Sequence, residues 1–376
     1  MSTDLFDPHN IKVKMPNQTL AENVAKITVV GVGGGGCNMI NHMIVEGTPK
    51  INLISANTDQ QVLNISKAPL KIQLGKVLTK GLGAGMKPEI GRDSALESYD
   101  EIKDALIGSD IVFIAAGLGG GTGTGAAAIV ASAAKEVGAL TVSVVTKPFS
   151  FEGKKRAGLA NLGLEEIKKV SDSIIVIPND RLLESVDHNI GMKDAFRIVD
   201  NVLYQAVNGI SEVILNPGNS DIHTDFADVK TIMQHKGMAL MGIGRAKGED
   251  SARQALSNAI ESPLLDKMPL AGAKGILIHF NVNPNVSMFA ISDVMNDIHD
   301  TIDGNAEIIF GTTTSDALDI DEVKITIVAT GFDSTKSMEE QKNKEAPTKT
   351  KPKPGDENYI DIPPLMRDYV VRYPLG

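Results

Sequence analysis

The chain has 376 residues, of which 42% are hydrophobic and 36 are glycine, which is enough for two domains with a sizeable core and many loops. Its net charge of −10 argues against nonspecific nucleic-acid binding. A single cysteine, Cys37, excludes an internal disulfide and favours a reducing compartment. Residues 1–25 carry acids and no apolar core segment, so we expect a loosely held extension there rather than a signal peptide.

The first regular element is a buried-type strand over Lys26–Gly31, followed by a glycine-rich run and a helical stretch to about Val45. Gly31, Gly33 and Gly36 satisfy the dinucleotide-binding pattern G-x-G-x-x-G. The acid that binds ribose in such folds lies about 20 residues on, whereas Asp59 follows Gly31 by 28. The pattern alone is therefore weak, and no P-loop sequence with its lysine occurs.

A second glycine loop is far more specific. Apolar residues 111–116 lead into a loop of five glycines and two threonines, and an alanine-rich, helix-favouring run extends to Val137. The loop consists of Gly119, Gly120, Gly121, Thr122, Gly123, Thr124 and Gly125. The stretch between Asp110 and Lys135 has no charge, but its glycines would break a membrane-spanning helix. A glycine loop before a helix start lets backbone N–H groups approach an anion, which predicts phosphate binding.

Strands and helices alternate through the first half of the chain. The other expected elements are a strand at 51–59, a flexible loop at 81–85, a helix at 88–107, a strand at 139–149, a helix at 151–170 and a strand at 172–180. Nearly continuous apolar strands between helices predict an α/β fold with a parallel sheet covered on both faces. Ligands of such sheets bind at the carboxyl ends of the strands, where each candidate loop lies.

The second half begins with a long helix over Met192–Leu215, which Asn216-Pro217-Gly218 ends, and a new helix near Thr224 or Asp225. A smaller α/β layer is then expected, with helices at 251–260 and 292–302 and strands at 275–282, 306–313 and 323–332. Residues 333–357 contain six lysines, six acids and three prolines, the composition of a disordered linker. A more apolar terminal peptide follows, which favours partner binding.

Seven segments in one order give the chain a close resemblance to the FtsZ family of bacterial cell-division proteins in the tubulin superfamily of GTPases. They are GVGGGG, NTD, KGLGAGMKPEIGR, FIAAGLGGGTGTGAA, TKPFSFEGKKR, IPNDRLL and DFADVKTIM. The resemblance implies a tubulin-like fold with a GTP-binding domain (26–190), a central helix (191–217), a C-terminal domain (218–332), a linker (333–357) and a partner-binding peptide (358–376).

The resemblance also implies a set of nucleotide contacts. The phosphates would lie against Gly33, Gly34, Gly35, Gly36, Asn38 and the loop 119–125. Asn57, Asp59, Gly83, Ala84 and Gly85 would line the phosphate and ribose side, and Asn179, Phe196 and Asn201 would hold the guanine. Glu152 and Arg156 would contact ribose and phosphate, although an exposed ion pair four residues apart is the simpler interpretation.

Asn201 departs from the family, which usually has Asp at this position; here Asp200 is its neighbour. A carboxylate accepts hydrogen bonds from both guanine N1–H and N2–H, whereas an amide accepts through one atom only. We therefore expect guanine binding to survive with altered preference over other purines.

Asp225 and Asp228 are the candidate catalytic residues. Three residues apart at a helix start, their carboxylates share one face, and the simpler interpretation is that they favour the helix dipole. The resemblance implies instead that this loop reaches the nucleotide of the next subunit, positions a water and helps hold a cation. Head-to-tail contacts of this kind build open filaments. His223 replaces a typical Asn, which suggests pH-dependent turnover.

Cofactors and partners follow from the same resemblance. We expect GTP and GDP, with Mg²⁺ arriving on the nucleotide. The six histidines other than His223 lack metal-ligand spacing, which argues against a zinc site. The tail would bind membrane-tethering and regulatory division proteins through Tyr359, Ile360, Asp361, Ile362, Pro363, Pro364, Leu365, Met366 and Arg367. The expected location is the cytoplasm at the division site, with no membrane span and no specific nucleic acid. Two alternatives stay open: a dinucleotide-dependent oxidoreductase, which leaves the loop 119–125 unexplained, and a filament scaffold that binds nucleotide with little hydrolysis.

Overall fold

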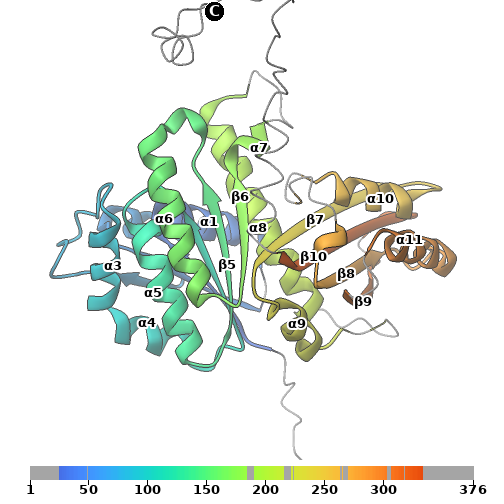
Figure 1. Cartoon of the computed structure of the whole chain (residues 1–376), viewed down its shortest axis with the longest axis horizontal. Helices are drawn as coiled ribbons and strands as arrows, with labels where there is room; N and C mark the ends of the chain where they lie inside the picture. Colours follow the sequence, from blue (N-terminus) through green and yellow to red (C-terminus); the bar gives the residue numbers. More distant parts are fainter. Residues whose placement is uncertain are drawn as a thin grey trace, which may run out of the picture. The chain divides into compact units, whose positions relative to one another are not determined.

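One mixed sheet of ten strands runs through the part of the chain that the computed structural model describes (Figure 1). That part is residues 25–332 without 49, 184–189, 216–221, 223, 263–264, 266–269, 303–305 and 317. The described residues all belong to one compact unit. The predicted N-terminal extension (apart from residue 25), His223, the linker and the terminal peptide lie outside the described residues.

The elements of the first half are as follows. The strands are β1 (Ile27–Val32), β2 (Ile51–Asn57), β3 (Leu70–Gln73), β4 (Ile111–Gly117), β5 (Leu140–Lys147) and β6 (Ser173–Pro178). The helices are α1 (Gly33–Glu46), α2 (Gln60–Ile65), α3 (Pro88–Glu97), α4 (Tyr99–Leu106), α5 (Thr122–Glu136), η1 (Ser150–Glu152), α6 (Lys154–Val170) and α7 (Asn179–Leu183).

The second half opens with the long helix α8 (Met192–Leu215). It continues with α9 (Phe226–Met233), β7 (Met238–Lys247), α10 (Ser251–Ile260), η3 (Leu270–Gly272), β8 (Gly275–Val282), α11 (Met288–Thr301), β9 (Glu307–Thr314) and β10 (Glu322–Phe332). None of the described helices has the length and apolar character that a membrane span requires.

The strand order is β3-β2-β1-β4-β5-β6-β7-β10-β8-β9. All neighbours from β3 to β7 pair in parallel, as Ile27 does with Ile51 and Ile111. β10 is antiparallel to both β7 and β8. β1 and nearly all of β4 are buried, because α1 and α8 cover one face while α4, α5 and α6 cover the other. The predicted α/β fold with a parallel sheet covered on both faces is confirmed.

Several predicted boundaries were wrong. The helix expected over 88–107 is two helices that meet at Ser98, and the one expected over 151–170 is split into η1 and α6 at Gly153, whose φ is +98°. α1 begins at Gly33, inside the glycine run, and Asn179 and Asp180 belong to α7 rather than to a strand end. β7 was not predicted, although it joins the two halves of the sheet by pairing with β6.

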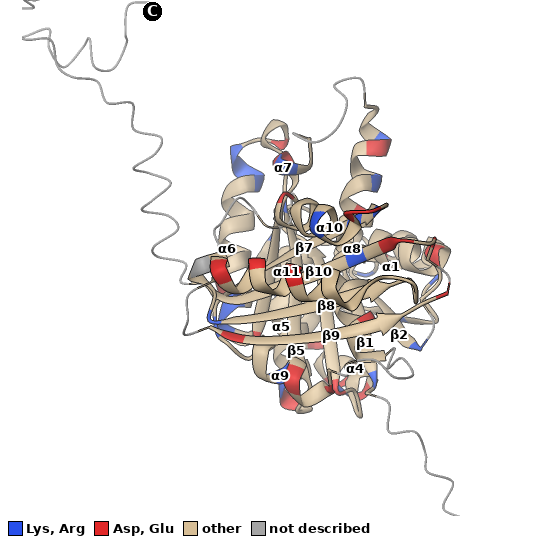
Figure 2. Ribbon diagram, turned by 90° about the vertical axis from the view of Figure 1, so that its right-hand side faces the viewer, with Lys and Arg blue, Asp and Glu red and all other residues tan. Residues whose placement is uncertain are grey.

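The long helix α8 separates two ends of the molecule. It follows α7 at the carboxyl edge of the parallel strands, and the chain returns at α9 to the amino edge, where Met238 pairs with Ile174 near the start of β6. At 24 residues it is about 36 Å long. Figures 1 and 2 both show α7 and α9 at opposite ends, with acidic residues (red in Figure 2) on α9.

Candidate functional site

Two helix starts meet at the carboxyl edge of the sheet. Gly33 has φ +72°, and a Cβ there would lie 2.7 Å from the backbone nitrogen of Gly123. A Cβ on Gly35 would lie 3.4 Å from Gly117. The first turns of α1 and α5 are therefore side by side, and neither contains an acidic residue. Their free N–H groups and helix dipoles together form an anion site.

A third loop closes on this pair. The Thr58 hydroxyl lies 2.6 Å from the Thr122 hydroxyl, and the backbone N–H of Gly83 donates to the Thr58 carbonyl at 3.3 Å. A Cβ on Gly121 would lie 2.9 Å from Cβ of Ala84. The predicted residues around positions 57–59 and 83–85 thus come together with the loop 119–125.

Two of these side chains already have structural partners. Asp59 caps α2, with Oδ1 accepting the N–H groups of Gln61 at 2.8 Å and Val62 at 3.4 Å. The Asn57 amide donates to Sγ of Cys37 at 3.8 Å and accepts the N–H of Asp59 at 3.2 Å. Asn38, on the first half of α1, is exposed, and its side chain has no hydrogen-bond partner among the described residues.

Glu152 and Arg156 follow β5, and Arg156 lies beside the loop 119–125. They form an ion pair four residues apart, and Glu152 Oε1 also accepts the N–H of Phe149 at 2.9 Å. A Cβ on Gly119 would lie 3.0 Å from the carbonyl oxygen of Arg156. The structure therefore contains the simple ion pair, and Arg156 lies next to the loop 119–125.

The other end of the site has features that suit a flat base. Asn179 is buried, and its Oδ1 has no hydrogen-bond partner among the described residues. The ring of buried Phe149 contacts Phe196 edge to face at 5.5 Å, and Phe196 is 41% exposed. An unpartnered buried acceptor carries a free-energy cost that a ligand donor would remove.

Asp200 on α8 was not among the predicted site residues. It follows Phe196 by one turn of α8 and shares its face. Burial raises the pKa of its carboxyl to about 6, although His42 lowers it in part. Asn201 is rotated by roughly 140° from Phe196, and its Oδ1 lies 3.5 Å from Nε2 of His42 on α1. The i, i+4 spacing from Phe196 was the available signal.

Asp225 and Asp228 lie elsewhere. Asp225 is the exposed N-cap of α9, at the amino edge of the sheet and at the opposite end of α8 from the glycine loops. The structure does not bring the two acids to the anion site of the same chain.

The residues fit a nucleoside triphosphate. A cradle of backbone N–H groups suits phosphates, while Phe196, the Asn179 acceptor and the Asp200 carboxylate suit a base with N–H donors. The described residues contain no cluster of three or more His, Cys, Asp or Glu with metal-binding geometry.

Comparison with known proteins agrees with this geometry. Residues 26–187 match the Tubulin/FtsZ family, GTPase domain, and residues 237–333 match the FtsZ family, C-terminal domain. The empty FtsZ dimer of M. jannaschii is 46% identical with a TM-score of 0.77, covering 83% of this chain and 90% of that chain. A GTPγS-bound protofilament of CetZ2 from Haloferax volcanii has a TM-score of 0.70 at 17% identity, covering 85% and 98%. GDP-bound monomeric CetZ1 from the same organism has a TM-score of 0.70 at 18% identity, with the same coverage. At these identities the two CetZ proteins show a shared fold.

Proposed function

The chain belongs to the FtsZ family of tubulin-like GTPases, and from that premise we propose that it hydrolyses GTP where two subunits meet head to tail. Asp225 and Asp228 of one subunit complete the nucleotide site of the next. GTP is the substrate, and GDP and phosphate are the products.

The separation of the two halves of the site carries this proposal. The anion cradle lies at the carboxyl edge of the sheet, and the two acids lie at the amino edge, beyond a helix of 24 residues. A span of about 36 Å is too long for one chain to bring its own acids to its own phosphates. Because the two surfaces differ, their contact is heterologous and repeats along an open filament.

Each half has a distinct chemical task. The N–H groups at the starts of α1 and α5 stabilise negative charge on the phosphates, and neither of these first turns carries an acidic residue. Asp225 and Asp228 orient the attacking water, and positioning supplies most of what phosphoryl transfer requires. Mg²⁺ bound to the triphosphate supplies further charge neutralisation.

Base recognition is assigned to Asn179, Phe196 and Asp200, with Asp200 in place of Asn201. Phe196 and Asp200 share a face of α8, whereas Asn201 is directed toward His42. An ionised Asp200 accepts guanine N1–H and N2–H together, so the family preference for Asp is met one residue earlier than the sequence suggested.

Assembly and partners rest on the family. Relatives have been solved as an FtsZ dimer and as a CetZ2 protofilament, which supports self-association here. The terminal peptide at 358–376 would bind membrane-tethering and regulatory proteins, and would concentrate the protein in the cytoplasm at the division site. Removing residues 358–376 should then abolish that localisation and leave GTP turnover unchanged.

The test is GTP turnover per chain as a function of protein concentration with Mg²⁺ present. A threshold followed by rising specific activity is expected for a shared site. A constant rate per chain down to high dilution would mean that each chain has a complete site. Bound GTP without turnover at any concentration would support the nonhydrolysing scaffold instead.

A further inference from the structure

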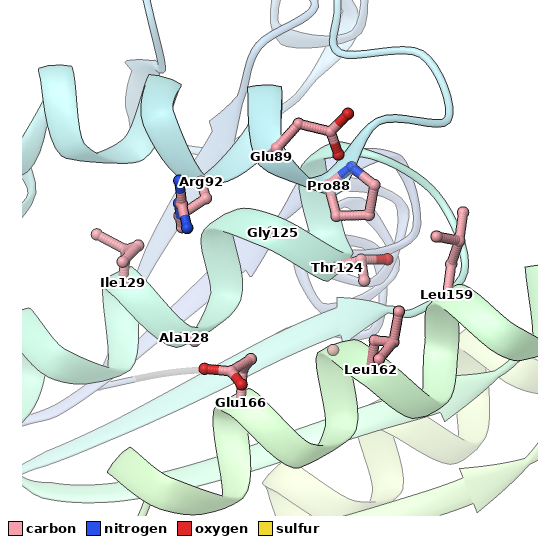
Figure 3. Close-up of a pocket in the computed structure, with 11 residues that line it drawn as sticks. Pro88, Glu89, Arg92, Thr124, Gly125, Ala128, Ile129, Leu159, Leu162 and Glu166 are labelled. Atoms are coloured by element: carbon pink, nitrogen blue, oxygen red, sulfur yellow. The ribbon is translucent and has the colours of Figure 1, made fainter.

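A pocket of about 280 Å³ lies between α3, α5 and α6 (Figure 3). We propose that it is a second ligand site, for a compact and largely apolar cation, and that its occupancy changes nucleotide affinity through the first turn of α5. The binding site stands without the proposed function, and only the coupling rests on nucleotide binding.

The pocket exists because three helices touch at glycines and then diverge. A Cβ on Gly125 would overlap the carbonyl oxygen of Pro88 on α3, and a Cβ on Gly163 of α6 would lie 2.5 Å from Cγ2 of Thr124. Beyond this point α5 presents the small side chain of Ala128, with Ile129 beside it. The α6 side chain of Leu162, 67% exposed, borders the space that remains.

The lining determines what would bind. Pro88, Ala128, Ile129, Leu159 and Leu162 supply apolar surface, and ligand pockets of this kind start at roughly 300 Å³. The size and chemistry therefore suit one compact ring system rather than a long chain.

The charges around the pocket favour a cation. Figure 3 shows Arg92 entering from α3 and Glu166 from α6, on opposite sides of Ala128. Arg92 forms an ion pair with Asp93 at 2.9 Å, and Glu166 forms one with Lys169 at 2.6 Å. The Glu89 carboxylate has no ion pair or hydrogen bond within the described part of the chain, so the uncompensated charge at the rim is negative.

The pocket shares residues with the anion cradle. Thr124 and Gly125 line it, and the Thr124 hydroxyl accepts the N–H of Gly119 at 2.9 Å. A ligand against this turn restrains the helix start that faces the phosphates. By linkage, nucleotide must change the affinity of that ligand by the same factor.

The experiment is a fluorescence titration of the full chain, saturated with GDP, with the cationic fluorophore 9-aminoacridine. Saturation with GDP keeps the flat probe out of the base site. The double variant E89Q/E166Q should weaken binding about tenfold, with three- to fivefold from each charge. The double variant E101Q/E165Q removes the same net charge from exposed ion pairs outside the pocket, and should leave the affinity within about twofold.

A filling variant tests the position independently. Ala128→Leu should abolish binding of the probe, and the anionic fluorophore 1-anilinonaphthalene-8-sulfonate should bind at least tenfold more weakly than the cation. Equal affinity in the wild type and all variants, or preference for the anion, would each overturn the site. An Ala128→Leu variant that alters sedimentation of the assembled protein, with no probe bound to the wild type, would make this surface a subunit contact instead.

The coupling between the pocket and the nucleotide site is measured separately. The GDP dissociation constant should change on saturation with 9-aminoacridine by the factor that GDP changes the affinity of the probe. Intact probe binding without that change would overturn the coupling alone. Failure of the shared catalytic site would instead appear as a turnover rate independent of protein concentration.

Discussion

Asp225 and Asp228 cap each other across the first turn of α9. Oδ1 of Asp225 accepts the N–H of Asp228 at 2.9 Å, and Oδ2 of Asp228 accepts the N–H of Asp225 at 3.3 Å. The pair therefore stabilises the helix whether or not it acts on a nucleotide, and removing a side chain disturbs both roles together.

Asp225→Asn separates these roles. Asn is as good an N-cap as Asp, so we expect nearly unchanged stability to urea, whereas Asp225→Ala should lose about 1 kcal/mol. Both variants should lose roughly 10²-fold or more in GTP turnover, because neither supplies the carboxylate, and both should still bind GTP. Wild-type turnover in Asp225→Asn would reduce the pair to a helix cap.

Two glycines of the anion cradle should respond in opposite ways to substitution. A Cβ on Gly34 meets nothing within 4 Å, and an acid in the first turn of a helix is favourable to the dipole. Gly34→Asp should therefore fold normally but lose GTP affinity, by roughly tenfold or more, through repulsion of the phosphates. Filter binding measures the affinity, and thermal unfolding measures the fold.

Gly125→Ala is the matched contrast. Its Cβ would overlap the Pro88 carbonyl oxygen of α3, and overpacking of this kind costs about 1–3 kcal/mol. We expect a lower unfolding temperature. Normal stability of Gly125→Ala, or an unfolded Gly34→Asp, would contradict the helix packing described here.

Strong local periodicity explains which elements were predicted. α8, α10 and β8 have the bounds that the sequence predicted, because each has a sustained apolar pattern between clear breakers. β7 was missed because Gly242 and Gly244 dilute its strand pattern. Side chains there would overlap the carbonyl oxygens of Ala259 and Ala255 on α10, a tertiary contact that no local pattern contains.

Part of the candidate site was also predictable from the sequence. Ligands of parallel sheets bind at the carboxyl ends of the strands, so the glycine loops that follow strands were predicted to lie at one edge of the sheet. The face of α8 that meets a base depends on helical phase, and the sequence predicted Asn201, whereas the structure places Asp200 on the face of Phe196. The distance between Asp225 and the cradle depends on where the second half of the sheet continues, which only the fold determines.

Asp200 should give stability and binding opposite dependences on pH. Burial raises the pKa of its carboxyl from the ordinary value of 3.8 to about 6 in the folded chain, so protonation favours the folded state. The resulting contribution to the free energy of unfolding is fully present below about pH 4 and is lost as the pH rises through about 6. After allowance for solvent access it amounts to about 1–2 kcal/mol.

Guanine affinity should fall over the same range as pH decreases, since protonated Asp200 no longer accepts two N–H groups. Urea unfolding of the nucleotide-free protein and GDP titrations between pH 5 and 8 measure the two trends. Asp200→Asn should flatten both relative to wild type. Unchanged pH profiles in that variant would remove Asp200 from the base site.

The rate at which Cys37 is alkylated reports on the stability of the fold. Burial raises the pKa of its thiol to about 11, against partial lowering by Ser55 and Asn57, and the residue is fully buried in α1. Iodoacetamide should therefore react only through unfolding. GDP at 100 times its dissociation constant should slow labelling about 100-fold. Fast labelling that GDP does not affect would mean that α1 opens locally.

Mixing two inactive variants tests the shared site most directly. Asp225→Ala keeps its phosphate cradle, whereas Gly34→Asp keeps its acids, so a contact that joins the cradle of the first to α9 of the second is complete. In a random equimolar filament such contacts are at most about a quarter of the total, which sets the expected fraction of wild-type turnover. A mixture of Asp225→Ala with Asp228→Ala has two damaged α9 starts and should stay inactive. Equal inactivity of both mixtures, with co-assembly verified by sedimentation, would mean that the acids serve the chain that carries them.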